Sequence, residues 1–162
     1  MAVVFLGIGS NQLPEDNLRL GIAALRERFV VRALSRVYRN PAIGFEGPDF
    51  LNTVACVETE LTPRAVCEAL EEIHDLAGRE RNSARFVNRI LDIDLLLYDD
   101  LVQHEPPVSV PRDDVLNYAF VLGPLADIAP DLVHPETGRT MAEHWRAFEG
   151  GPEQLTPVDL DL

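Results

Sequence analysis

The segment Arg89–Tyr98, RILDIDLLLY, is the most apolar run of the chain and nevertheless contains two aspartates. If it forms a strand, side chains two positions apart share a face, so Asp92 and Asp94 point the same way, roughly 6.6–7 Å apart along the chain. The opposite face is expected to carry Leu91, Ile93, Leu95 and Leu97. Neighbouring carboxylates repel each other, and burying them is costly without a cation. The stretch therefore predicts a buried strand with a core on one face and a cation, either arginine or magnesium, on the other.

Patterns on both sides of this strand predict the order strand, helix, strand, strand, helix, strand. Proline begins each helix, at Pro14 and Pro63, where its missing N–H is not needed. The other strands are expected over Ala2–Gly9, Val30–Tyr38 and Phe50–Glu58, and a further short helix over Ala119–Ile128. This order is that of the ferredoxin-like split βαβ fold. We expect an α+β domain over residues 1–148, with a central antiparallel sheet, helices packed on it and long active-site loops, and an acidic, flexible tail over 149–162.

Composition excludes several classes of function. The net charge of −13 disfavours a nucleic-acid or anionic-membrane surface, and no apolar run approaches the roughly 20 residues of a membrane span. All 14 basic side chains are arginine, which excludes a phosphate-binding P-loop lysine or a Schiff-base lysine. The N-terminus MAVVFLGIGSN is interpreted as a first strand rather than a signal peptide, and Cys56 and Cys67 as reduced core thiols. A cytoplasmic protein is expected.

Four arginines lie just before the acidic strand, three within the polar segment Gly78–Asn88 and one directly after it. They are Arg79, Arg81, Arg85 and Arg89. Taken alone, such a run is most often a solvated charged loop, and a D-x-D strand most often an ion pair, here with Arg89. Together they favour ATP-dependent phosphoryl transfer, because acids hold the metal ions that bridge phosphates and guanidinium groups bind the remaining charge.

Several motifs in a fixed order resemble those of one family. They are FLGIGSN, VYRNPAIG, PDFLN, GRER, RILDIDLLLYDD and FVLGPLADIAPDLVHP, spread over Val3 to Pro135. The chain resembles the 6-hydroxymethyl-7,8-dihydropterin pyrophosphokinases of folate biosynthesis. The resemblance implies transfer of diphosphate from ATP to the hydroxymethyl group of the pterin, with release of AMP. It also implies a monomer that binds these two small molecules, two Mg²⁺ ions as cofactor, and neither nucleic acid nor membrane as partner.

The resemblance also assigns candidate site residues. The implied metal ligands are Asp92 and Asp94, which share the catalytic role with Arg79 and Arg89. The implied ATP-binding residues are Arg79, Arg81 and Arg89, and Arg112 is added as a further candidate for ATP binding because it is cationic. The implied pterin-binding residues are Asn40, Ile43, Phe50, Asn52 and Phe120. An amide such as Asn52 inside an apolar strand is expected to have a partner, and a flat ring is well held between two aromatic faces.

The chain departs from the family pattern at four positions. Arg112 stands where the family usually has histidine, Tyr118 where it has arginine, His74 where it has an acid and Phe86 where tryptophan is common. Arg112 could recover a lost phosphate contact, whereas Tyr118 cannot replace a charge. The alternative function is therefore a catalytically weakened paralogue that binds pterin or nucleotide as a sensor or partner protein. A ferredoxin-like nucleic-acid module is a third possibility, which the acidic balance disfavours.

Overall fold

A six-stranded antiparallel sheet forms the centre of the molecule. The structure is a computed structural model that describes residues 1–78 and 91–162. The strand order is β5-β1-β4-β3-β8, and β2 also pairs with β4. The strands are β1 (Ala2–Ser10), β2 (Val30–Leu34), β3 (Val37–Asn40), β4 (Phe50–Thr59), β5 (Asp92–Tyr98) and β8 (Thr156–Val158). A separate hairpin is formed by β6 (Gln103–Glu105) and β7 (Val108–Val110).

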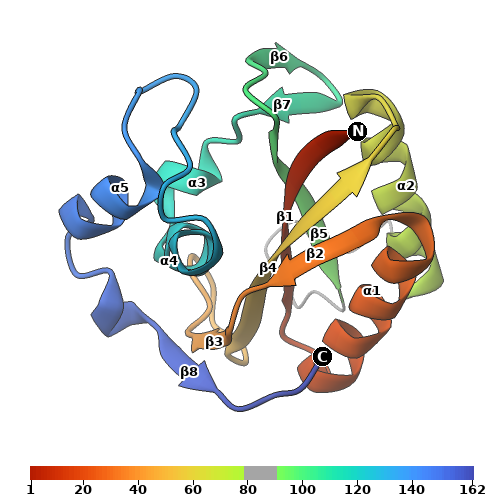
Figure 1. Ribbon diagram of the computed structural model, residues 1–162. Coiled ribbons are helices and arrows are strands. Elements are labelled where there is room, and N and C mark those ends of the chain that lie inside the picture. The colour runs from red at the N-terminus through yellow and green to blue at the C-terminus, as the bar shows by residue number, and fades with distance from the viewer. Residues whose placement is uncertain (79–90) are drawn as a thin grey trace.

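Helices cover both faces of this sheet (Figure 1). One face carries α1 (Pro14–Arg28) and α2 (Pro63–Leu76), and the other carries α3 (Asp114–Asn117), α4 (Ala119–Ile128) and α5 (Met141–Ala147). The apolar side chains between sheet and helices form two buried clusters, one on each face. The predicted α+β fold with a central antiparallel sheet is confirmed. Among the described helices, none has the length and apolar character required to cross a membrane.

The two long helices begin and end where the sequence predicts. Proline occupies the first turn of each helix, and the Thr62 side chain caps α2 by accepting a hydrogen bond from the Ala65 N–H (3.2 Å). Gly78 follows α2 with φ of 78°, a conformation that glycine adopts without steric cost. These signals fix α2 against β5, the strand that carries the two aspartates.

Strand β5 contains a β-bulge that the alternating pattern does not reveal. Leu95 pairs with Leu6 and Leu97 pairs with Phe5, so Leu96 is the extra residue. A bulge reverses the alternation of faces beyond it. Leu97 was expected on the same face as Ile93, and that expectation is wrong: Leu97 packs in the opposite cluster, with Phe5.

The predicted strand Val30–Tyr38 is divided into β2 and β3 at Ser35. The Ser35 hydroxyl oxygen accepts the hydrogen bond from the Val54 N–H (2.9 Å), while the Ser35 N–H donates to the Val54 carbonyl oxygen (2.9 Å). A side chain thus replaces a backbone acceptor at this point of the ladder, and the chain changes direction. The change directs β3, and with it Asn40, toward the start of β4.

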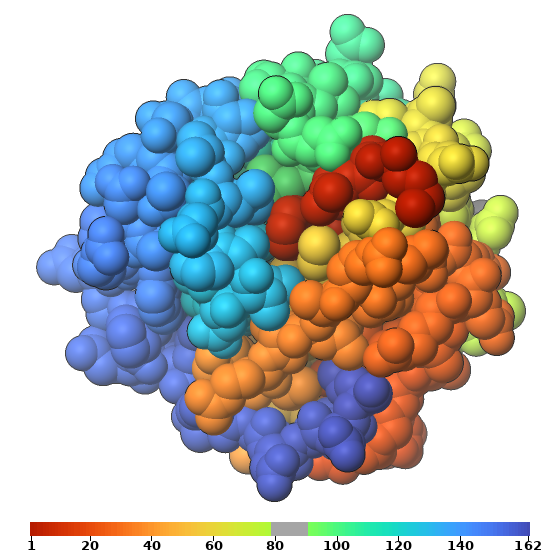
Figure 2. Space-filling view, in the orientation of Figure 1, coloured from red at the N-terminus to blue at the C-terminus, as the bar shows by residue number. Residues whose placement is uncertain are grey.

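The segment 149–162 was expected to be a flexible tail, but the structure gives it a defined path. It forms a short 3₁₀ turn, η1 (Pro152–Gln154), followed by β8, which pairs with β3. The buried Leu155 packs in a small cluster with Tyr38 and Ala119, and the Arg26 side chain donates to the Leu162 carbonyl oxygen (3.4 Å). In Figure 2 the dark-blue C-terminal residues lie against the orange and red-orange surface of β3 and α1. Apolar contacts and strand pairing therefore hold a segment whose composition is acidic.

Leu155→Ala is expected to lower the free energy of unfolding by about 2–3 kcal/mol, toward the lower end of buried leucine truncations. Leu155 is 9% exposed, so truncation leaves a space under Tyr38. Urea unfolding measures the difference, with Leu76→Ala as the matched control, because the side chain of Leu76 is 64% exposed. Equal effects of the two substitutions would show that the C-terminal segment adds nothing to the core.

Candidate functional site

A cavity of about 360 Å³ opens where β1, β4 and β5 meet the beginnings of α3 and α4. It gathers residues that are far apart in the sequence. Its lining includes every described residue predicted to bind substrate or metal: Asn40, Ile43, Phe50, Asn52, Asp92, Asp94, Arg112 and Phe120. The other predicted residues, Arg79, Arg81 and Arg89, lie outside the described residues.

Aromatic side chains line two parts of this cavity. Phe120 at the start of α4 stacks on Tyr118, with ring centroids 5.0 Å apart and planes inclined by 20°. Phe50 at the start of β4 makes an edge-to-face contact with Phe45, with centroids 6.2 Å apart. Aromatic pairs in these arrangements support one another and limit ring rotation. The cavity therefore offers apolar ring surfaces suited to a flat ligand.

A pair of buried amides forms the polar part of the same cavity. The Asn52 Nδ2 group donates to the Asn40 side-chain oxygen, and the Asn40 Nδ2 group donates to the Pro41 carbonyl oxygen (3.1 Å). This chain of donors fixes the orientation of the Asn52 amide, and its Oδ1 lies directly over Gly9 of the neighbouring strand. A buried carbonyl oxygen held in this way is a fixed acceptor for a ligand N–H group.

If this cavity holds the pterin that the sequence resemblance implies, Gly9→Ala is expected to weaken pterin binding by about tenfold. A Cβ at position 9 would collide with Asn52 Oδ1, so the amide must turn and lose its fixed orientation. Calorimetric titration with the pterin measures the change. Gly7→Ala on the same strand is the comparison, because the atoms nearest to its Cβ would be those of the Leu96 side chain, at 3.4 Å and beyond. Equal losses for the two variants would contradict a specific role for the Asn52 amide.

A second cavity, of about 490 Å³, lies on the other side of the aspartates, between α2, β5 and the β6–β7 hairpin. Its lining is more polar and includes Cys67, Glu71, His74 and Ser109. The two cavities share three charged residues, Asp92, Asp94 and Arg112. Ligands in the two cavities would therefore meet at these side chains.

The two aspartates provide oxygen ligands suited to magnesium. Asp92 and Asp94 occupy one face of β5, and their side chains are 24% and 32% exposed, so both can reach a ligand in the cavities. Magnesium is usually bound through one or two carboxylates together with substrate phosphates. Among the described residues there is no group of three or more His, Cys, Asp or Glu side chains that could hold a metal alone. The pair therefore fits magnesium that binds together with a phosphorylated ligand.

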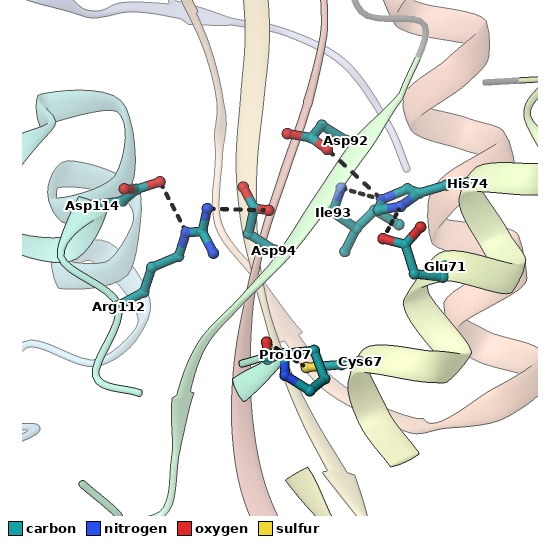
Figure 3. Close-up of polar contacts among 9 residues, drawn as sticks. All are labelled: Cys67, Glu71, His74, Asp92, Ile93, Asp94, Pro107, Arg112 and Asp114. Atoms are coloured by element: carbon teal, nitrogen blue, oxygen red, sulfur yellow. Dashed lines mark hydrogen bonds and ion pairs between the residues drawn. The ribbon is translucent and has the colours of Figure 1, made fainter. Parts of the chain in front are cut away.

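His74 connects α2 to the strand between the aspartates (Figure 3). Its imidazole is almost fully buried, and Nε2 accepts a hydrogen bond from the Ile93 N–H (2.8 Å). Nδ1 lies 3.2 Å from Glu71 Oε1, and Asp92 Oδ1 lies 3.9 Å from Nε2. His74 thus provides the hydrogen-bond acceptor for the Ile93 N–H of β5. This contact holds the backbone in place between Asp92 and Asp94.

Arg112 lies between two carboxylates at the junction of the cavities (Figure 3). Its Nε donates to Asp114 Oδ2 (3.1 Å), and its Nη2 lies 3.7 Å from Asp94 Oδ1. Burial alone would lower the pKa of Arg112, but the carboxylates of Asp94, Asp114 and Asp92 raise the pKa above its usual value. The Arg112 N–H donates to the carbonyl oxygen of Leu96, the bulge residue (2.9 Å), which fixes the arginine beside the aspartates.

Several lining residues were not predicted from the sequence. Gly9, Phe45, Asp114 and Tyr118 line the first cavity, and His74 and Cys67 line the second. Tyr118 and His74 stood out only as departures from a pattern. Asp114 had a detectable signal, because an acid close after an arginine in sequence can pair with it, but Asp113 lies even closer to Arg112 in the sequence. Only the helical turn at Asp114–Asn117 distinguishes the two.

Comparison with known proteins identifies one family. Residues 5–130 match the family model described as 7,8-dihydro-6-hydroxymethylpterin-pyrophosphokinase (HPPK). The 2-amino-4-hydroxy-6-hydroxymethyldihydropteridine pyrophosphokinase of Pseudomonas aeruginosa is 36% identical over 153 residues, covering 91% of this chain and 93% of the relative. The protein of the same name from Haemophilus influenzae is 33% identical over 141 residues, covering 85% of this chain and 88% of the relative.

Solved structures show the same fold. Wild-type HPPK-DHPS of Plasmodium falciparum superimposes with a TM-score of 0.78 at 12% sequence identity. The match covers 98% of this chain and 47% of that one, so the present chain spans less than half the length of the solved protein.

Proposed function

Because the chain belongs to the 7,8-dihydro-6-hydroxymethylpterin-pyrophosphokinase family, we propose that it transfers the terminal diphosphate of ATP to the hydroxymethyl group of 6-hydroxymethyl-7,8-dihydropterin and releases AMP, a reaction of folate biosynthesis. One observation carries the proposal beyond family membership. Two cavities of different character share Asp92, Asp94 and Arg112. Transfer of a charged group between two bound molecules requires such a junction.

The first cavity is the proposed pterin site. Phe50 and Phe120 offer ring surfaces to the flat heterocycle. The fixed Asn52 oxygen accepts a hydrogen bond from the amide-like edge of the pterin, and the loop residue Ile43 contributes an apolar contact. In this pose the hydroxymethyl group lies toward the aspartates, because Gly9 of β1 pairs with Asn52 of β4 on one side and with Asp92 of β5 on the other.

The second cavity is the proposed nucleotide site, with the ATP phosphates at the junction. Among the residues that the structure describes, Arg112 lines this cavity and can contact the phosphates. Its planar guanidinium suits bidentate phosphate contacts. The proposed phosphate-binding roles of Arg79, Arg81 and Arg89 rest on sequence resemblance. Tyr118, at a usual arginine position, is engaged with Phe120 and serves the pterin side instead.

Asp92 and Asp94 are the proposed ligands of two magnesium ions that accompany ATP. Bound there, the ions would supply positive charge that offsets the negative charge of the phosphate oxygens. The hydroxymethyl oxygen forms a bond to the β-phosphorus, the bond from that phosphorus to the AMP oxygen breaks, AMP leaves with the electron pair, and the hydroxyl proton is lost. The protein contributes position and fixed charge, which supply most of the rate enhancement in phosphoryl transfer. No described side chain need act as a strong base.

Release of AMP from ATP that depends on the pterin tests this function. We expect AMP and the pterin diphosphate to form in equal amounts with magnesium, and neither to form without the pterin or with a chelator. AMP release at the same rate without the pterin would overturn the proposal. Binding of both ligands without product would instead identify the catalytically weakened paralogue.

A further inference from the structure

Arg112 is attached unequally to its two carboxylate partners. The contact with Asp114 is a hydrogen bond of 3.1 Å from Nε, whereas the contact with Asp94, at 3.7 Å from Nη2, is an ion pair beyond hydrogen-bonding distance. The guanidinium is therefore anchored at Asp114 and only attracted toward Asp94. Figure 3 shows Arg112 between these residues, with its Nη groups on the side of β5.

The backbone near Arg112 restricts how far the guanidinium can move. The Arg112 N–H is bound to the Leu96 carbonyl oxygen, and the Arg112 carbonyl oxygen accepts from the Val115 N–H (3.1 Å) in the turn that begins α3. Asp114 opens that helix, so anchor and arginine belong to one compact turn. Without the anchor, the side-chain torsions would let the guanidinium approach Asp94, the nearest remaining carboxylate.

We propose that Asp114 is a positioning residue, which holds Arg112 back from Asp94 and so limits how strongly Arg112 competes with a divalent cation for the Asp94 carboxylate, while directing the Nη groups to the phosphates at the junction. This inference deepens the proposed function and rests on it for the catalytic part. Asp114 also lines the first cavity, so a direct contact with the pterin is the competing explanation that the test must separate.

Manganese titration, followed by the loss of its free-ion electron spin resonance signal, tests the anchor without any turnover. In the absence of nucleotide, Asp114→Ala is expected to raise the dissociation constant for Mn²⁺ about three- to tenfold, because Arg112 then pairs closely with Asp94. Arg112→Ala is expected to lower this constant. The double variant should bind Mn²⁺ as Arg112→Ala does, since the anchor has nothing left to hold. Asp113→Ala is the matched control, because Asp113 is an exposed neighbour whose side chain makes no helix-capping bond.

Steady-state kinetics test the catalytic consequence. Asp114→Ala is expected to lower kcat about tenfold and to raise KM for ATP severalfold, while KM for the pterin changes less than twofold. In the Arg112→Ala background the same substitution should have little further effect, and Asp114→Glu, which retains a carboxylate, should recover part of the loss.

Three results would overturn the inference. The first is that Asp114→Ala changes Mn²⁺ binding no more than Asp113→Ala does. The second is that the effects of Asp114→Ala and Arg112→Ala simply add in the double variant. The third is that Asp114→Ala raises only the KM for the pterin. If the wild-type protein released no AMP, the proposed function would fail, but the Mn²⁺ titrations would still decide whether Asp114 controls Arg112.

Discussion

Replacing Asp94 by alanine is expected to lower turnover at saturating magnesium by about 1,000-fold or more, and Asp92→Ala by a similar factor. Each carboxylate is proposed to hold a cation against the transferred diphosphate, and such charge stabilisation is worth several kcal/mol, at about 1.4 kcal/mol per factor of ten. The fold should survive, because both side chains face the cavities rather than the core. Single-turnover measurement of AMP release gives the effect on the chemical step.

Asp100→Ala is the control for this experiment, since Asp100 is an exposed aspartate in the turn after β5. Asp94→Asn separates charge from shape, because it keeps the size of the side chain and loses the carboxylate. Turnover within tenfold of wild type for either alanine variant would show that the aspartates do not hold the catalytic cations.

Phe120→Ala and Phe50→Ala are each expected to weaken pterin binding by about 1–3 kcal/mol, or roughly 5- to 150-fold. The loss arises because the heterocycle no longer has an aromatic surface on one side. Nucleotide binding should change less than twofold, since neither residue lines the second cavity. Calorimetry with each ligand measures both affinities on the same preparation.

Two further substitutions distinguish stacking from packing. Phe120→Tyr keeps the ring and should retain most of the affinity, whereas Phe120→Leu keeps apolar volume and should not. If affinity followed side-chain volume alone, or if both ligands were affected equally, the aromatic pterin site would be rejected.

Local signals in the sequence were sufficient to predict most of the sheet and the long helices. Proline at the helix starts, the Thr62 cap and Gly78 mark boundaries that depend on nearby residues only. Strand β8 could not be predicted in this way. It has three residues, one of them Pro157, and lacks the alternating run that identifies a strand. It forms because β3 presents an unpaired edge, which is a property of the folded chain.

The residues of the site likewise differ in whether they could be predicted from the sequence. Residues on strands, such as Asp92, Asp94 and Asn52, could be proposed from pattern and resemblance, and the structure brings them to one cavity. The positions of Leu97 and Arg112 depend on the bulge at Leu96. The bulge moves Leu97 to the opposite face of the sheet, and the Leu96 carbonyl oxygen accepts a hydrogen bond from the Arg112 N–H. A bulge has no clear signature in a run of leucines. Asp114 likewise acquires its contact from a single turn of helix.

The central position of β1 has a consequence for how the protein is made. Pairing of β1 with β5 joins position 8 to position 93, across more than half of the 162 residues. Such long-range closure slows folding, because chain entropy is lost before the contacts form. On the ribosome, β1 is synthesised before both strands that pair with it, and its apolar side chains and unpaired backbone stay exposed until β4 and then β5 follow. We expect the nascent chain to depend on chaperones during this interval, and the paired aspartates to gain their geometry only when β5 docks beside β1 at the edge of the sheet.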